Sequence, residues 1–129
     1  KFLKKIIAQS QDDLRVISAL CYDSTVKKSE IKFLKKNKVF LLPLIRKNRE
    51  IDDISKNTQS IIKFEHIESS KSKNIKREDN QNLLNLLAID LFKKSENFEI
   101  ALLFSDNKVI TLASEVIEVT LDDIMELND

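Results

Sequence analysis

Apolar and polar side chains alternate over several stretches of the chain, which is the pattern of half-buried β-strands. Residues 83–92 fit both a helix and an alternating strand, and the short connection to the next apolar stretch favours a strand for their second half. With this segment the pattern predicts six or seven strands. The other strands are expected over residues 2–8, 25–34, 39–46, 61–69, 98–104 and 109–119.

Two stretches carry helix-start signals instead. Ser10 with Asp13 three residues later has the form of a capping box, and apolar residues recur after it at helical spacing. We therefore expect a helix over residues 11–22. Thr120 and Asp123 repeat the same spacing, so a second, short helix is expected at the C-terminal end.

Polar segments separate these elements. Residues 47–60 and 71–82 are highly charged and lack periodicity, so we expect two long surface loops there. Antiparallel strands with a helix near each end predict an α+β fold. The expected architecture is one domain, residues 1–129, with a six- to seven-stranded antiparallel sheet or a partly closed barrel. A pleckstrin-homology-like barrel is one such form.

Turn chemistry is unusual because the chain contains no glycine and one proline. Asparagine is the residue that best replaces glycine at positive φ, so Asn37 and Asn107 are expected in left-handed conformations at hairpin turns. Pro43 removes a ladder donor from an apolar strand, which predicts an edge strand or a bulge. An apolar edge near Pro43 is also where a second copy of the chain could pair, so a homodimer is one expected partner arrangement.

Composition bounds the class of protein. The chain is 42% hydrophobic and 33% charged, and no apolar run approaches the ~18 residues of a membrane span. Residues 1–50 carry 13 Lys/Arg against five Asp/Glu, whereas residues 51–129 carry nine against 16. A single cysteine, Cys21, excludes an internal disulfide, so we predict a reducing cytoplasmic location.

Few residues are available for chemistry. Cys21 lies on the apolar stripe of the expected first helix and His66 lies in a strand, so a Cys–His nucleophile pair is not favoured. One histidine and one cysteine cannot form a usual zinc site, and phosphate-binding loops depend on glycine. We therefore expect no catalytic residue, no metal site and no cofactor.

Lysines cluster on the first expected hairpin, as a nucleic-acid surface would require. Phe33 and Phe40 are more plausible as core residues than as stacking platforms, and lysines on strand edges also prevent aggregation. Nucleic acid is therefore the less favoured partner. The lysines are Lys27, Lys28, Lys32, Lys35, Lys36 and Lys38.

The stretch DDLRVISALCYDS, residues 12–24, carries a family resemblance. Its acidic pair, its Leu-x-Val-Ile-Ser-Ala run and the later Asp23 and Ser24 resemble an uncharacterised alphaproteobacterial family, domain of unknown function 2948. The similarity continues through Phe40, Arg46 and Glu50 and covers nearly the whole chain. Asn74 stands where the family usually has glycine. The resemblance implies a cytoplasmic alphaproteobacterial setting and no stated activity.

The sequence thus favours a small non-enzymatic interaction or scaffold protein whose partner is another protein. Arg46, Glu50, Lys71, Lys73 and Asp23 are the candidate binding residues, because they are charged, lie next to loops and match the family pattern. A salt-bridged loop anchor explains them equally well. Two alternatives remain.

The first alternative is an enzyme or binder that acts on a small anionic ligand through Asp23, Arg46 or His66. The second is weak nucleic-acid binding through the lysine-rich hairpin. A pocket that gathered those three side chains would favour the first alternative.

Overall fold

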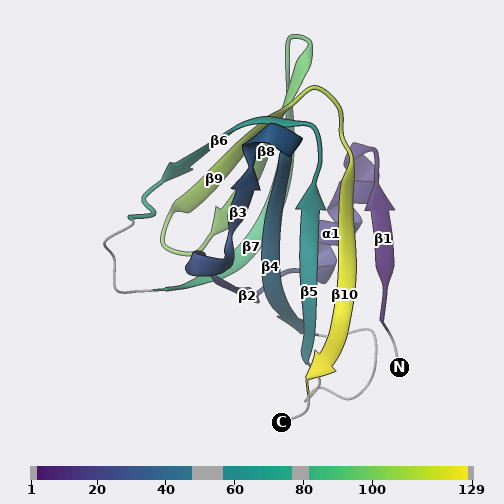
Figure 1. Cartoon of the computed structure of the whole chain (residues 1–129), viewed down its shortest axis with the longest axis vertical. Helices are drawn as coiled ribbons and strands as arrows, with labels where there is room; N and C mark the ends of the chain where they lie inside the picture. Colours follow the sequence, from purple (N-terminus) through teal and green to yellow (C-terminus); the bar gives the residue numbers. More distant parts are fainter. Residues whose placement is uncertain (1–2, 48–56, 77–81, 128–129) are drawn as a thin grey trace.

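The computed structural model describes residues 3–47, 57–76 and 82–127. In these ranges ten strands form one sheet in the order β1-β10-β5-β4-β2-β7-β8-β9-β6, and β3 pairs with β4 beside this path (Figure 1). All pairings are antiparallel. The strands are β1 (Lys5–Ala8), β2 (Ser24–Lys27), β3 (Lys32–Leu34), β4 (Val39–Lys47), β5 (Asn57–Phe64), β6 (Ile67–Lys73), β7 (Leu83–Lys94), β8 (Asn97–Phe104), β9 (Lys108–Ser114) and β10 (Val119–Leu127).

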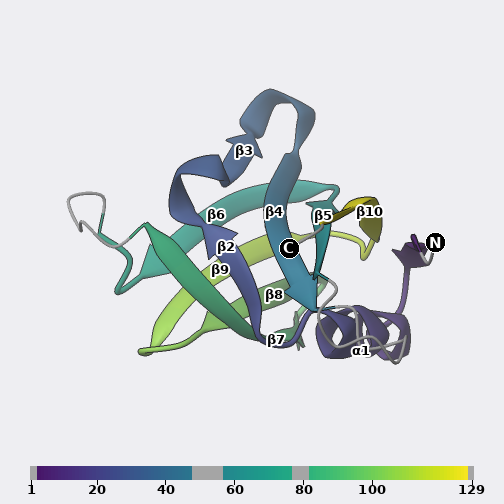
Figure 2. The same ribbon diagram turned by 90° about the horizontal axis from the view of Figure 1, so that it is seen from below.

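The chain turns a corner between β5 and β6. β5 pairs with β4 and β10, whereas β6, only two residues later, pairs with β9 on the other wall of the sheet. His66 at the corner has φ 61°, and the Ile67 N–H donates to the Lys38 carbonyl at 2.8 Å. The sheet therefore curls into an incomplete barrel, which Figure 2 shows from below.

The core lies on the concave face of this sheet. Every second residue of β4, of β5 and of β10 as far as Asp123 points inward, and the register aligns them in rows across the three strands. Phe64 lies between Phe40 and Val119 in one row, and the next row is equally apolar. The Phe40 ring is 6.1 Å from the Phe64 ring, centroid to centroid, in an edge-on arrangement. The strict alternation thus builds a continuous apolar interior.

The helix α1 (Gln11–Leu20) covers an open side of the barrel, between β1 and β7 (Figures 1 and 2). The Ser10 hydroxyl accepts from the Asp13 N–H at 3.1 Å, so the predicted cap at Ser10 is confirmed, although the Asp13 carboxylate accepts from the Gln9 N–H and does not close a capping box. The predicted helix is confirmed as well, but it ends at Leu20 instead of residue 22. The Ser18 hydroxyl accepts from the Ile89 N–H at 2.9 Å, just after a bulge in β7. In the described ranges no helix has the length and apolar character needed to cross a bilayer.

The predicted C-terminal helix is wrong, because residues 120–127 belong to β10. Val119, Leu121 and Asp123 alternate as inward-facing strand residues, and Asp123 uses its carboxylate on other strands rather than as a helix cap. The predicted α+β fold with six or seven strands is also wrong. The described chain is a mostly antiparallel β-structure with ten strands and one α-helix.

The observed strand boundaries also differ from the predicted ones. The predicted strand 61–69 is divided by the corner into β5 and β6, and β7 is a strand throughout. Asn57 and Lys73, which were expected in loops, lie at strand ends. Residues 48–56 and 77–81 of the two predicted loops lie outside the described residues.

Pro43 does not lie on an edge strand or at a bulge, so that prediction is wrong. β4 pairs with β5 along its length without a register shift. On its other side β4 pairs with β3 as far as Leu41 and with β2 at Ile45. Pro43 occupies the change of partner between them, where no ladder pair is formed on that side. The expected apolar edge for a second copy is therefore not there.

Seven described residues with side chains have positive φ, and most end a strand or helix. The prediction for Asn107 is confirmed, with φ 59°, and it forms the β8–β9 turn together with Asp106 at φ 63°. Two successive positive values are the signature of a type I′ hairpin. The prediction for Asn37 is wrong by one residue, because Lys38 has φ 57°. Asn74, at the position of the family's glycine, has φ 65°.

Replacement of Asn107 tests this turn. Asn107→Ala is expected to lower the free energy of unfolding by about 1 kcal/mol, because alanine has a larger steric penalty in the left-handed region. Asn107→Gly should keep wild-type stability. Both variants keep the backbone carbonyl that accepts from the Asn74 amide at 2.7 Å. Urea unfolding of the three proteins measures the difference, and equal losses for alanine and glycine would contradict the turn assignment.

Candidate functional site

A buried ion pair occupies one end of the barrel interior. Arg46, on β4, donates from Nε to Asp123 Oδ1 at 2.9 Å and from Nη2 to Asp123 Oδ2 at 2.6 Å. Both side chains are 0% exposed. Asp123 lies on β10, and β5 runs between the two strands. The guanidinium therefore reaches across a whole strand to make a bidentate contact.

Two further donors complete the carboxylate of Asp123. The Ser60 hydroxyl donates to Oδ1 at 2.6 Å, and the Lys4 N–H donates to Oδ2 at 2.8 Å. Burial by itself opposes ionisation of Asp123, but the hydrogen bonds from Arg46, Ser60 and Lys4 outweigh it and lower the pKa below the usual 3.8. The charged pair thus ties β4, β5, β10 and the residue that precedes β1 together.

This geometry does not give Arg46 the predicted role on a binding surface. Its side chain is fully buried and bound to Asp123, so it does not lie on a binding surface. His66 lies at the corner after β5, where its Nε2 is 3.4 Å from Glu118 Oε1. Arg46 is opposite Thr58, eight positions from His66, which is about 26 Å along a strand. The structure therefore does not bring Arg46 and His66 into one pocket.

The remaining predicted residues are spread over the molecule. Asp23 has φ 65° and forms an ion pair with Lys47 near one end of β4. Glu50 lies outside the described residues. Lys71 and Lys73 are exposed on β6, which is the last strand in the sheet order. Asp23 lines a hollow of about 300 Å3, whereas the two lysines lie on a strand that borders a different hollow.

That hollow is a slot between β3 and β6, where the barrel stays open. At one end Ile67 is hydrogen-bonded to Lys38, and at the other the Lys28 Nζ donates to the Lys76 carbonyl at 2.7 Å. Between these bridges the slot has a cavity volume of about 700 Å3, within the usual ~300–1,000 Å3 of binding pockets.

The slot has an apolar floor and a polar wall. The apolar side chains are Ile31, Phe40, Ile75 and Ile110, and the polar lining residues are Lys28, Ser29, Ser70, Ser72 and Asn82. Phe40 is 2% exposed and Ile110 5% exposed, so the floor is the outer limit of the core. A ligand in the slot would therefore contact apolar groups below and hydroxyl groups at the β6 side.

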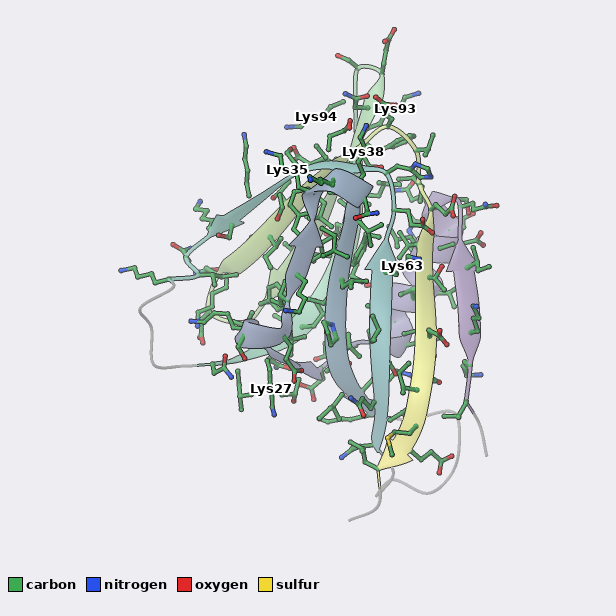
Figure 3. All side chains as sticks on the ribbon, in the orientation of Figure 1. Lys27, Lys35, Lys38, Lys63, Lys93 and Lys94 are labelled. Atoms are coloured by element: carbon green, nitrogen blue, oxygen red, sulfur yellow. The ribbon has the colours of Figure 1, made fainter. Side chains whose placement is uncertain are left out.

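Positive charge surrounds the slot. Among the lining residues the one lysine is Lys28, and the two neighbouring segments, residues 28–38 and 67–76, together carry eight lysines and two glutamates. One of the glutamates, Glu68, pairs with Lys38 at 2.9 Å and raises the pKa of that lysine. Figure 3 shows Lys35 and Lys38 at one end of the β3–β4 hairpin, apart from Lys27 at the other. The field at this opening favours an anionic partner.

Aromatic stacking platforms are not exposed among these lysines. Phe40 is buried, so the prediction that it belongs to the core is confirmed, whereas Phe33 is partly buried and packs on the Phe40 ring with a centroid distance of 6.3 Å. Non-specific binding of single-stranded nucleic acid uses exposed aromatic side chains as well as charge. The lysine-rich hairpin supplies the charge alone.

The key residues that sequence reasoning missed are Asp123 and the two serines of the slot. Asp123 continues the inward alternation of Val119 and Leu121, and a charge in that series was the available signal. Ser70 and Ser72 alternate with Lys71 and Lys73, but only the pairing of β6 with β9 shows which of them face inward.

The fold and the slot define a class of protein, an incomplete antiparallel barrel with a basic opening, rather than an activity. A family model described as "Protein of unknown function (DUF2948)" matches residues 4–128. The chain belongs to this family, and the resemblance seen in the sequence is confirmed. No curated protein matches the chain.

One solved structure is similar, the "Crystal structure of an uncharacterized protein from Neisseria gonorrhoeae". It is 19% identical, covers 92% of this chain and 97% of its own, and has a TM-score of 0.49.

Removal of one partner of the buried ion pair tests its structural role. Asp123→Asn is expected to lower the free energy of unfolding by about 3–5 kcal/mol, because the Arg46 charge remains buried without its counter-charge. The double variant Arg46→Met, Asp123→Leu should lose clearly less than Asp123→Asn. Chemical denaturation of the three proteins measures both values. A double variant less stable than the single one would contradict this account.

The pH dependence of stability supplies a second test. The folded pKa of Asp123 is lowered, so its contribution is present above the unfolded value of 3.8 and is lost as the pH falls through the folded pKa. Wild type should therefore lose more stability than the double variant between about pH 5 and pH 2. Denaturation curves at several pH values compare the slopes, and parallel slopes would contradict the assignment to Asp123.

Proposed function

We propose that this chain is a non-enzymatic interaction module that binds an acidic segment of another protein at the slot between β3 and β6. The observation that carries the proposal is the combination of an apolar floor in the slot with lysine-rich segments on either side of it. Apolar contact supplies affinity, and the lysines steer and select an acidic partner.

The choice of a protein segment over nucleic acid rests on the apolar floor. Phosphate backbones are bound mainly by cations, whereas the floor residues Phe40 and Ile110 offer contacts that need apolar side chains in the partner. Lys71 and Lys73, two of the residues predicted from the sequence, remain in the proposed surface. Arg46 is left out because it is buried.

The proposal keeps a reducing cytoplasm as the compartment. Cys21 is 0% exposed and belongs to the core as a small apolar group. Such a residue needs no oxidised partner, which is the ordinary situation of a cytoplasmic protein.

Charge reversal on β6 tests the proposed surface. The probe is a panel of octapeptides that each contain four glutamates and four valines or isoleucines in varied order. At least one should bind, and Lys71→Glu with Lys73→Glu should weaken that binding by about tenfold, because each reversal replaces attraction by repulsion. Calorimetric titration at low and high salt measures the affinity, which should fall with salt.

The matched control is Lys93→Glu with Lys94→Glu, which makes the same charge change on the β7–β8 hairpin (Figure 3). This variant should keep nearly the wild-type affinity. Equal weakening by both double variants would reduce the effect to net charge, and no binding of any acidic peptide would overturn the proposed function.

A further inference from the structure

We infer that the acidic partner binds as an added β-strand along the free edge of β6, with apolar and acidic residues in strict alternation. This inference rests on the proposed function and specifies how the slot recognises its partner. It is carried by the place of β6 in the sheet and by the direction in which its side chains point.

β6 presents a free edge to the slot. It is the terminal strand of the sheet and pairs on one side with β9. Toward the other side Ile67 is bonded to Lys38, whereas the stretch from Ser69 to Lys73 makes no backbone hydrogen bond to an element other than β9 among the described residues. Alternate residues of such a stretch direct N–H and C=O groups into the opening. Five residues offer about 16 Å of edge.

The alternation along β6 fixes what an added strand must carry. Ser70 is paired with Leu112 and Ser72 with Ile110, and both partners are buried, so this series faces the slot, where Ser70 is half-buried and Ser72 exposed. Lys71 and Lys73 belong to the opposite, outward series and are exposed. Residues of the added strand that lie beside the serines would cover the apolar floor, and those beside the lysines would lie in the basic field.

Lys71 and Lys73 also disfavour some of the strands that could pair with the edge of β6. Lysine on an edge strand normally blocks pairing with a second copy of the same edge. Two β6 edges side by side would oppose like charges, which is unfavourable in cross-strand pairs. An acidic strand would instead be attracted by the same lysines, so the edge would accept an acidic strand while repelling a second copy of itself. This points to a different protein as the partner, not to a second copy of this chain.

The experiment compares octapeptides of identical composition. One alternates glutamate with valine, and the other places the four glutamates in one block. Two further peptides keep the alternation but carry N-methyl groups on alternate backbone amides, one in each phase. Strand addition predicts that the alternating peptide binds about tenfold more tightly than the block peptide. It also predicts that one N-methylated phase loses binding while the other retains most of it.

Hydrogen exchange provides an independent readout. Backbone amides between Ser69 and Lys73 that face the slot should become protected when the alternating peptide binds. If alternating, block and both N-methylated peptides bind equally, strand addition is overturned while acidic binding at the slot stands. If none of them binds and the Lys71→Glu, Lys73→Glu variant behaves as wild type, the proposed function itself has failed.

Discussion

The corner at Glu65 and His66 is the constraint on which the rest of the structure depends. Two consecutive strands leave it in different directions, one to pair with β4 and β10 and the other to pair with β9. The two walls of the barrel are thereby joined by a connection of two residues. The Ile67 N–H fixes the start of β6 to Lys38, but β6 and β3 form no ladder with each other in the described residues. The slot follows directly from this geometry, since the walls are held together at the corner and separate beyond it.

At the other end of β5 the register is held by charge instead of by a turn. A one-residue slip of a strand moves every side chain to the opposite face. Here such a slip would carry Arg46 or Asp123 out of the interior and break a contact in which both carboxylate oxygens accept two donors each. A buried pair of this kind is weak evidence for net stability, but it penalises the wrong pairing strongly. A bulge in β10 comes directly after Asp123, so the ladder changes register just past the point that the pair holds.

Local signals in the sequence predicted local structure well. The helix cap at Ser10, the buried stripe of α1 and the left-handed Asn107 depend on residues within a few positions of one another. The failures came from contacts between distant parts of the chain. Asp123 imitates a helix start, yet its partner is 77 positions away on β4. Lys71 and Lys73 were found by their charge, but no periodicity could show that β6 would pair with β9 and border an opening. Arg46 was singled out for its charge and its place near a loop, and the alternation of β4 already placed it with Leu42 and Leu44 on the buried face.

The absence of glycine has a consequence for the unfolded chain as well as for the turns. Residues such as Lys38 and Ser95 hold positive φ with a full side chain, at a steric cost in the native state. A chain without glycine also has fewer accessible backbone conformations when it is denatured, by an amount worth about 0.4–1 kcal/mol for each position compared with glycine. The entropy lost on folding is correspondingly smaller. The steric cost in the native state and the smaller entropy loss on folding oppose each other at each left-handed turn. A protein without glycine can therefore form tight hairpins without a large net loss of stability.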